Sequence, residues 1–306
     1  MNETRSLLRQ GYEKYLRQGI PFQIRHPVGE LGSQVLLPTK YLEEVKKAPT
    51  DLFSFEAYSA KSFLLDYSRA PRQTEAAAHV IRVDLNRNLG PLVTDLWNEA
   101  AQHLSENVSF EWKTVSAYEL YHDDILLEVT ETLAKVQANN GQWTLQHVAM
   151  MRKLDSFMKE SARLNPIGFV STQRYTLKPY TFKDGFHLPA GTTIMFHSDG
   201  AHYDADNYPD PDKFDGYRFL RLRETVDPNR FHYASVSDSA LGFGAGIHAC
   251  PGRFLSAIVM KFFLINFMTQ YEFKYEHGGT ERLPNLYNDN TSRPAPTVNL
   301  LVRRKY

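Results

Sequence analysis

The chain has 306 residues, of which 42% are hydrophobic and 23% charged, so it is long enough to bury a large core. Its 35 basic and 35 acidic residues cancel, which leaves no basic field that would attract nucleic acid. The single cysteine excludes an intrachain disulfide.

The first third of the chain predicts helices around a short pair of strands. Residues 1–20 carry apolar side chains at helical spacing among many charges, which is typical of an amphipathic helix and not of a signal peptide or membrane anchor. Apolar runs between residues 21 and 38, separated by Gly and Pro, predict two strands and a turn. Helical spacing resumes in residues 40–49 and 79–104, and we expect the second stretch to break at Gly90-Pro91.

The rest of the chain predicts more helix than strand. Thr144 is a suitable N-cap for the clearest helix, and Asn165-Pro166 would end it. The apolar pattern predicts helices over 120–136 and 143–164, strands after Pro166, an irregular segment over 201–236, and a glycine-rich stretch over 242–252 that leads into a final helix. We therefore expect one mainly α domain with small β-sheets (α+β).

The glycine-rich stretch contains the only cysteine, in the string FGAGIHACPGRF from Phe243 to Phe254. Glycines four and six residues before Cys250 permit a tight turn, and Pro251 supports the start of a helix. A thiolate is favoured near a helix N-terminus and is a good ligand for iron. The alternative is an inert buried cysteine, which is the usual role of a lone Cys.

This string resembles the haem-ligand signature of the cytochromes P450, in its fungal form. The resemblance implies haem (iron-protoporphyrin IX) as the cofactor and Cys250 as the axial ligand of the iron. It also implies that Phe243 and Gly244 belong to the haem loop and that His248 contacts a propionate. Arg174, in QRYTL, matches a second position that often contacts a propionate in the family.

Two further strings match structural motifs of the same family. Glu160 and Arg163 are three residues apart in LDSFMKESARLNP, so they share a helix face and can pair. An ordinary surface ion pair is the alternative. The resemblance implies instead a structural triad completed by Arg218 of FDGYRF. His79 and Arg82 match, less closely, a helix that approaches the haem from another edge.

Two other patterns are read as coincidences. His197, Asp199, His202 and Asp204 are residue types that bind metals, but their spacing fits no standard metal site and the fungal family has a similar string as scaffold. Ala190-Gly191-Thr192-Thr193 resembles the oxygen-activating motif of the family. It lies in a predicted β-hairpin, after the Glu160 helix, which is the wrong element in the wrong order.

The resemblance covers the chain in two parts of one P450-like domain spanning residues 1–306. Residues 1–118 correspond to the early β-sheet and helices, and residues 119–306 to the haem-binding part. Between them the family has a central helix whose acid–alcohol pair delivers protons to oxygen. EWKTVSAYEL instead runs almost directly into YHDDILLEV. The family's membrane anchor is also absent from this sequence.

Three functions follow from these observations. The resemblance implies a monooxygenase of fungal secondary metabolism that oxidises an apolar small molecule, such as a terpenoid or polyketide, with electrons from an NADPH-dependent reductase. The missing helix favours a P450-derived protein without oxygen activation, acting as a cyclase, an isomerase or a ligand-binding remnant. An incomplete, inactive chain is the third possibility. Lacking a signal peptide or anchor, the chain is expected in the cytoplasm or peripherally at the endoplasmic reticulum.

Overall fold

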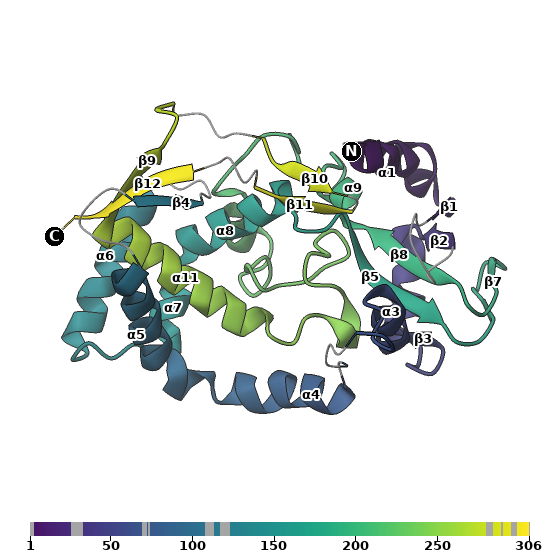
Figure 1. The fold of residues 1–306 in the computed structure, drawn as a ribbon, viewed down its shortest axis with the longest axis horizontal. Coiled ribbons are helices and arrows are strands. Elements are labelled where there is room, and N and C mark those ends of the chain that lie inside the picture. Colours follow the sequence, from purple (N-terminus) through teal and green to yellow (C-terminus); the bar gives the residue numbers. More distant parts are fainter. Residues whose placement is uncertain are drawn as a thin grey trace.

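Helices outweigh strands in the computed structural model (Figure 1). The structure describes residues 3–25, 33–68, 72, 74–107, 113–116, 123–279, 284–288, 290–294 and 299–305. The α-helices are α1 (Glu3–Lys14), α2 (Leu42–Lys47), α3 (Phe55–Ser62), α4 (Glu75–His79), α5 (Leu89–Asn107), α6 (Asp123–Ala138), α7 (Leu145–Met150), α8 (Arg152–Leu164), α9 (Ser198–His202), α10 (Arg218–Thr225) and α11 (Arg253–Gln270). Shorter helical turns are formed by Leu16–Gln18, Thr39–Tyr41, Val80–Leu85 and Gly246–His248.

The strands form one larger sheet and several small ones. The larger sheet has the order β1-β2-β8-β5-β3, in which β2 and β8 are parallel and the other pairs antiparallel. A second sheet has the order β4-β12-β9, and β6-β7 and β10-β11 are hairpins. The strands are β1 (Phe22–Arg25), β2 (Ser33–Leu36), β3 (Phe53–Ser54), β4 (Lys113–Ser116), β5 (Val170–Thr176), β6 (Tyr180–Thr181), β7 (His187–Leu188), β8 (Thr193–His197), β9 (Tyr271–Tyr275), β10 (Leu286–Asn288), β11 (Thr291–Arg293) and β12 (Asn299–Arg304).

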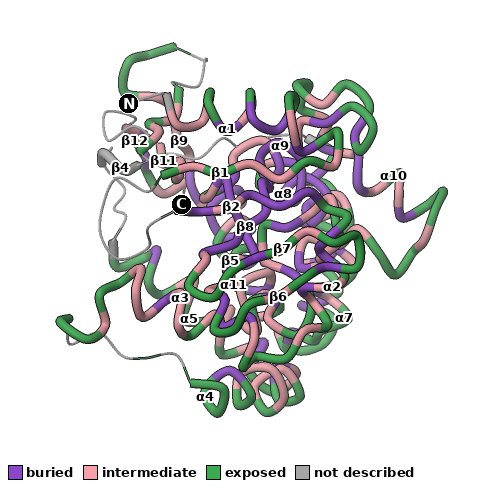
Figure 2. Tube along the Cα trace, turned by 90° about the vertical axis from the view of Figure 1, so that its right-hand side faces the viewer, coloured by how far each residue is buried: buried purple, intermediate pink, exposed green. Residues whose placement is uncertain are grey.

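The molecule has a helical half and a sheet half, each with its own core (Figure 1). In the helical half, α5, α6, α7, α8 and α11 enclose residues such as Val93, Val129 and Phe262, all fully buried. In the sheet half, α2 and the β6-β7 hairpin pack on the larger sheet around Phe53 and Ile194. In Figure 2, which is seen from the side of the sheet half, buried residues gather toward the middle of the view. The predicted α+β architecture is confirmed.

The predicted break at Gly90-Pro91 is wrong. α5 begins at Leu89 and continues through both residues to Asn107. Pro91 occupies the first turn of the helix, where the backbone N–H groups have no intrahelical acceptor and proline costs little. The irregularity lies earlier, in the π-helical turn of Val80–Leu85.

The single helix predicted over 143–164 is two helices. Thr144 is indeed the N-cap of α7, with a reciprocal capping box to His147. The chain then turns at Met151 (φ −77°, ψ 72°) before α8 begins. Glu128 on α6 explains the break, because its carboxylate accepts hydrogen bonds from the first backbone N–H groups of α8 at 2.8–3.0 Å. A second correction concerns residues 201–236, which are largely irregular but include α10.

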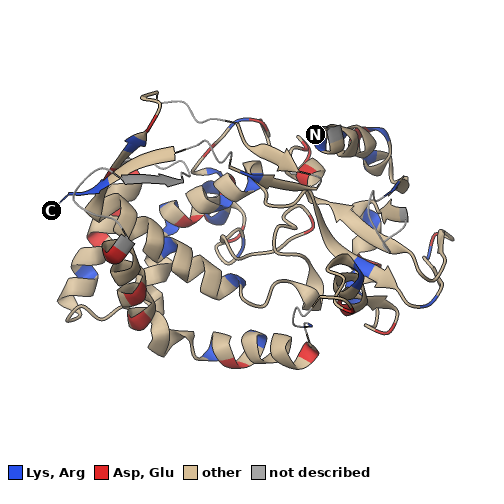
Figure 3. Cartoon of the chain, viewed as in Figure 1, with Lys and Arg blue, Asp and Glu red and all other residues tan. Residues whose placement is uncertain are grey.

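Charged residues are spread over both halves, whereas α11 is almost uncharged (Figure 3). Arg253 and Lys261 are its only charged residues. None of the helices in the described part of the chain has the length and apolar character needed to cross a bilayer. The expected junction at residues 118 and 119 lies outside the described residues.

Candidate functional site

Cys250 lies at the end of a tight loop that leads into α11. Its side chain is exposed, and it precedes the first residue of the helix by three positions. The backbone N–H of Cys250 donates to the carbonyl oxygen of Phe243 at 2.7 Å, which closes the loop. Gly244 (φ 77°) and Gly246 (φ 64°) adopt the left-handed conformation that favours glycine. The two glycines therefore make the turn that leaves the sulfur accessible.

The cysteine loop is held from several sides. Ser171 on β5 donates through Oγ to the carbonyl of Leu241 at 2.6 Å. The ring of Phe243 packs edge-on against Tyr233, with 5.5 Å between centroids. At the other end, Arg253 donates from Nη1 to the carbonyl of Cys250 at 2.9 Å. Contacts from three separate elements thus fix a loop that has little regular structure of its own.

A basic cluster gathers beside this loop, formed by His248, Arg174 of β5 and Arg82. His248 is half-buried, and its burial lowers the pKa of the imidazole. The charges of Arg174 and Arg82 lower that pKa further, while the carboxylate of Glu75 raises it. Arg82 pairs with Glu75 at 3.4 Å. The structure therefore brings together three of the basic residues that the sequence singled out, whereas His79 is exposed.

Arg174 is the most informative member of this cluster. It is only 3% exposed, and burial lowers the pKa of its guanidinium to about 10. Nη1 donates to the backbone carbonyl of Gln173 at 2.7 Å, but Nε has no hydrogen-bond partner in the described part of the chain. Arg174 also makes no ion pair there. A buried, uncompensated guanidinium is costly, so it fits a ligand that carries acidic groups, as the propionates of haem do.

Glu160, Arg163 and Arg218 form a buried, hydrogen-bonded triad. Arg163 binds both carboxylate oxygens of Glu160 at 2.8 Å, and Arg218 binds Oε1 at 3.1 Å. The other guanidinium nitrogens donate to backbone carbonyls between residues 202 and 213. The triad therefore fastens α8 to the irregular segment before α10, so the alternative of an exposed surface pair does not apply.

A second buried ionic network was not foreseen from the sequence. Asp155 on α8 accepts hydrogen bonds from Arg223 at 3.1 Å and from the backbone N–H of Tyr233 at 2.9 Å, and it pairs with Lys261 at 2.9 Å. Tyr233 in turn packs on Phe243 of the cysteine loop. The partners lie 68 to 106 positions from Asp155, so no local spacing could have revealed them. The only local signal was the high charge of α8, which carries six charged residues among its 13.

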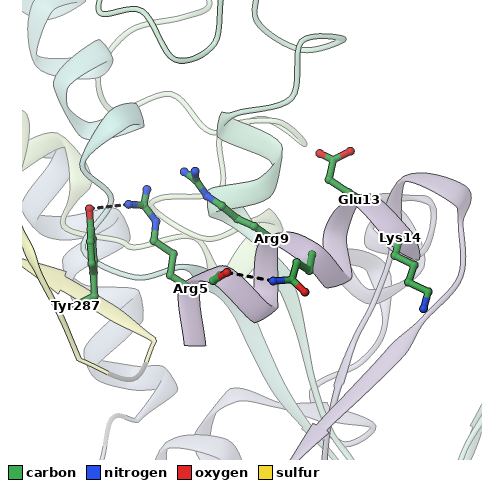
Figure 4. A pocket seen from close by; sticks show the side chains of 7 residues that line it. Arg5, Arg9, Glu13, Lys14 and Tyr287 are labelled. Carbon is green, nitrogen blue, oxygen red and sulfur yellow. Dashed lines mark hydrogen bonds between the residues drawn. The ribbon is translucent and has the colours of Figure 1, made fainter. Parts of the chain in front are cut away.

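The suspected metal-binding string serves as scaffold. Asp199 is fully buried and pairs with Arg5 at 2.9 Å and with Arg9 at 2.7 Å, both on α1. Figure 4 shows these two arginines beside Tyr287, whose hydroxyl accepts a hydrogen bond from Arg5 at 2.7 Å. Within the described residues, no group of three potential metal ligands is close enough to hold an ion. These contacts fasten the N-terminal helix to α9.

The Ala190–Thr193 string also lies where the sequence predicted, in the connection between β7 and β8. Gly191 adopts φ 84° at the turn, and Thr193 is fully buried as the first residue of β8. No helix carries this string, so its likeness to the oxygen-activating motif is coincidental.

The fold and the site together define a class. A helical protein with an accessible cysteine in a glycine-rich turn, beside a basic cluster that includes the buried Arg174, has the features of a haem-binding oxidoreductase. The profile of the family described as cytochrome P450 matches residues 118–302. The chain belongs to the cytochrome P450 family, and it is of the monooxygenase kind found among fungal relatives.

Three comparisons give the degree of similarity. Cytochrome P450 monooxygenase CYP3 of Pyricularia oryzae is 49% identical, covering 99% of this chain and 93% of that protein. Pyrichalasin C-7 hydroxylase of Pyricularia grisea is 35% identical over 99% of this chain and 89% of that protein. A solved structure, retinoic acid bound cyanobacterial CYP120A1, has a TM-score of 0.45 and 19% identity, covering 79% of this chain and 54% of that one.

The first of these alignments shows that the chain is internally shortened. It runs over 479 residues, whereas the chain has 306, so at least 173 alignment positions have no residue here. The gap is internal because nearly the whole of this chain spans nearly the whole of the relative. The expectation of a missing internal segment is therefore confirmed.

Proposed function

We propose that Cys250 is the axial thiolate ligand of haem and that His248 and Arg174 hold its propionates. The observation that carries this proposal is Arg174, a buried guanidinium beside the cysteine loop whose Nε has no hydrogen-bond partner among the described residues. Phe243 and Gly244 would shape the loop, since Phe243 accepts the hydrogen bond from the N–H of Cys250 and Gly244 makes the turn. Glu160, Arg163 and Arg218 have a structural role in holding the segment around the site.

The reaction proposed is hydroxylation of an apolar fungal metabolite, such as a terpenoid or polyketide. Bound haem supplies the oxygen chemistry: one atom of O₂ enters a C–H bond and the other leaves as water, with two electrons from NADPH and two protons. An NADPH-dependent reductase would deliver the electrons, at the surface of the endoplasmic reticulum or in the cytoplasm. The name of the relative pyrichalasin C-7 hydroxylase supports hydroxylation as the reaction type.

The internal gap favours a second candidate function. The chain lacks at least 173 positions of its relative, and the resemblance implies that the missing positions include the proton-delivering helix of the family. Such a chain would bind haem without activating oxygen, and would act as a cyclase, an isomerase or a ligand-binding protein.

One spectrum tests the haem site. The purified chain, reconstituted with haem, reduced and exposed to carbon monoxide, should show the red-shifted Soret band of a thiolate-ligated iron. Cys250→Ala should lose that band, while Ile247→Ala, an exposed residue of the same loop, should keep it. If the wild-type chain takes up no haem, the proposal is wrong.

A turnover assay then separates the two functions. With NADPH, a P450 reductase and an apolar substrate, the monooxygenase should form a hydroxylated product that carries one atom of labelled O₂. A preparation with the thiolate spectrum but no labelled product would favour the candidate without oxygen activation.

A further inference from the structure

A cavity of about 970 Å³ lies on the α10 side of the cysteine loop. Its walls come from α7, α8, α10, the first turns of α11 and the segment over residues 229–240. Cys250, His248 and Arg174 do not line it, so it is separate from the proposed haem site. Its size is within the range of pockets that hold small organic molecules.

The walls of this cavity are largely apolar, and one part of them carries buried charges. Asp155 and Lys159 of α8 and Lys261 of α11 form this charged part, and Arg230, His232, Arg253 and several Asn and Ser residues also line the cavity. The apolar part includes Leu145, Val148, Phe219, Leu222, Phe254 and Ile258. An occupant that matches this lining has an apolar body and a charged end.

The charges in this part of the cavity do not balance. Asp155 is engaged by Lys261, by Arg223 and by a backbone N–H, as described above. Lys159 is only 7% exposed and makes no ion pair in the described part of the chain. Its Nζ donates to the carbonyl of Ser235 at 2.9 Å and lies 5.3 Å from the ring centroid of Phe219. An ammonium group has three N–H donors, so Lys159 has donors to spare.

The ammonium of Lys159 remains mostly charged at neutral pH. Burial lowers the pKa of Lys159 to about 8; the charge of Asp155 raises it and that of Arg223 lowers it. The cations Lys159, Lys261 and Arg223 therefore lie near one buried carboxylate, that of Asp155. An additional anion would offset the free-energy cost of burying the excess positive charge.

We propose that this cavity binds an amphipathic carboxylate, whose acid group pairs with Lys159 and whose apolar chain fills the space between α7, α10 and α11. This site is distinct from the one where a substrate would be oxidised. An occupant would touch Arg253 and Asn86, which line the cavity and hydrogen-bond the carbonyls of Cys250 and Pro251. The occupied cavity would thereby brace the loop that carries the cysteine.

Calorimetric titration of the purified chain with laurate at pH 7 tests the proposal. Laurate should bind. 1-Dodecanol, which has the apolar chain but no charge, and inorganic phosphate, which has a negative charge but no apolar chain, should each bind at least about 10-fold more weakly. Lys159→Met should weaken laurate binding by about 30-fold or more, since it removes one partner of a buried charge pair. Lys47→Met, an exposed lysine of α2, is the matched control and should change nothing.

Two further variants keep the test decisive. Ala257→Phe fills the cavity from α11 and should also abolish binding, whereas Lys159→Arg retains the charge and should preserve it. Cys250→Ala should bind laurate normally; loss of binding in that variant would place laurate at the haem instead. The proposal is overturned if laurate does not bind, if Lys159→Met binds it as well as wild type, or if phosphate binds equally tightly.

Discussion

Arg174 carries a charge in a place where water cannot solvate it. Its neighbours in the described chain offer one backbone carbonyl and the ring of Phe55, 5.7 Å away, but no carboxylate. In the absence of an anion, this arrangement costs stability; with one, it becomes a strong charge-assisted contact. Arg174 therefore lowers the stability of the protein without an anion and raises its affinity for an anionic ligand.

Replacing this residue should separate stability from haem binding. We expect Arg174→Gln to lower the haem content of the purified protein several-fold, since a neutral amide cannot match a propionate. The unfolding free energy of the haem-free protein should stay the same or rise by about 1 kcal/mol, because a buried charge is removed. Haem absorbance and guanidinium denaturation measure the two effects. Equal haem content in the variant would contradict the assignment, and Arg221→Gln, 57% exposed, is the control.

Glu160 should behave in the opposite way. Glu160→Gln leaves Arg163 and Arg218 buried without their carboxylate, and we expect a loss of about 3–5 kcal/mol in unfolding free energy. Urea denaturation at pH 7 measures it. Glu13→Gln, which breaks an exposed pair with Arg17, should cost less than about 1 kcal/mol. Similar losses in the two variants would mean that the triad is not a structural anchor.

At the scale of elements, the cysteine loop depends on backbone conformation more than on contacts. A Cβ at Gly244 would meet its nearest neighbour, the carbonyl of His248, at an ordinary 3.5 Å. The constraint is its φ of 77°, which an L-residue adopts only at a cost. Gly252 has φ −86° and open space around it.

These two glycines provide a matched pair of variants. Gly244→Ala should cost about 1–2 kcal/mol in unfolding free energy and should reduce haem retention. Gly252→Ala should cost less than Gly244→Ala, because the residue already has a negative φ that alanine adopts without strain. Chemical denaturation of both variants checks the difference, and equal costs would show that the turn tolerates other conformations.

Local sequence signals predicted most helices and strands, whereas features such as the break at Met151 and the Asp155 network depend on contacts between residues far apart in the sequence. Thr144 located the start of α7, Asn165-Pro166 the end of α8, and the β-type run after Pro166 the strand β5, because caps and local composition act over a few residues. The break at Met151 depends on Glu128 of another helix, and the Asp155 network joins α8 to α10 and α11. No pattern within a short window encodes such contacts. The triad was predicted because a family motif carries long-range information.

At the scale of the whole molecule, two histidines make stability depend on pH. His197 and His202 are almost completely buried, and burial lowers the pKa of each to about 4. Asp199 raises these values and nearby cations lower them. The unfolded chain, with a histidine pKa near 6.5, binds more protons between these values, so stability falls as pH falls through that window.

The size of this effect can be measured. Between pH 7.5 and pH 5, the two rings together should remove about 4 kcal/mol of unfolding free energy, about 2 kcal/mol for each. Guanidinium denaturation at the two pH values checks it, and His202→Gln should remove about half of the difference. His79→Gln, an exposed position, should leave it unchanged. A flat profile in the wild-type chain would show that both rings reach water.

The outer side of α11 is unusual for a helix of its composition. Helices that are apolar on all sides are typical of buried positions. In α11, Ile258, Phe262 and Ile265 face the core, whereas Val259, Met260 and Phe263 are 40%, 42% and 41% exposed. These three side chains lie on one side of the helix, at i, i+1 and i+4.

The exposed apolar surface formed by Val259, Met260 and Phe263 affects how much of the protein stays soluble in a cell. Chaperones and proteases recognise exposed apolar segments, and the protein that they remove lowers the steady-state abundance. A low yield of soluble protein would then limit the total activity before turnover by each molecule does. Phe263→Lys should raise the soluble yield on expression without lowering the unfolding free energy, and an unchanged yield would show that this surface is tolerated.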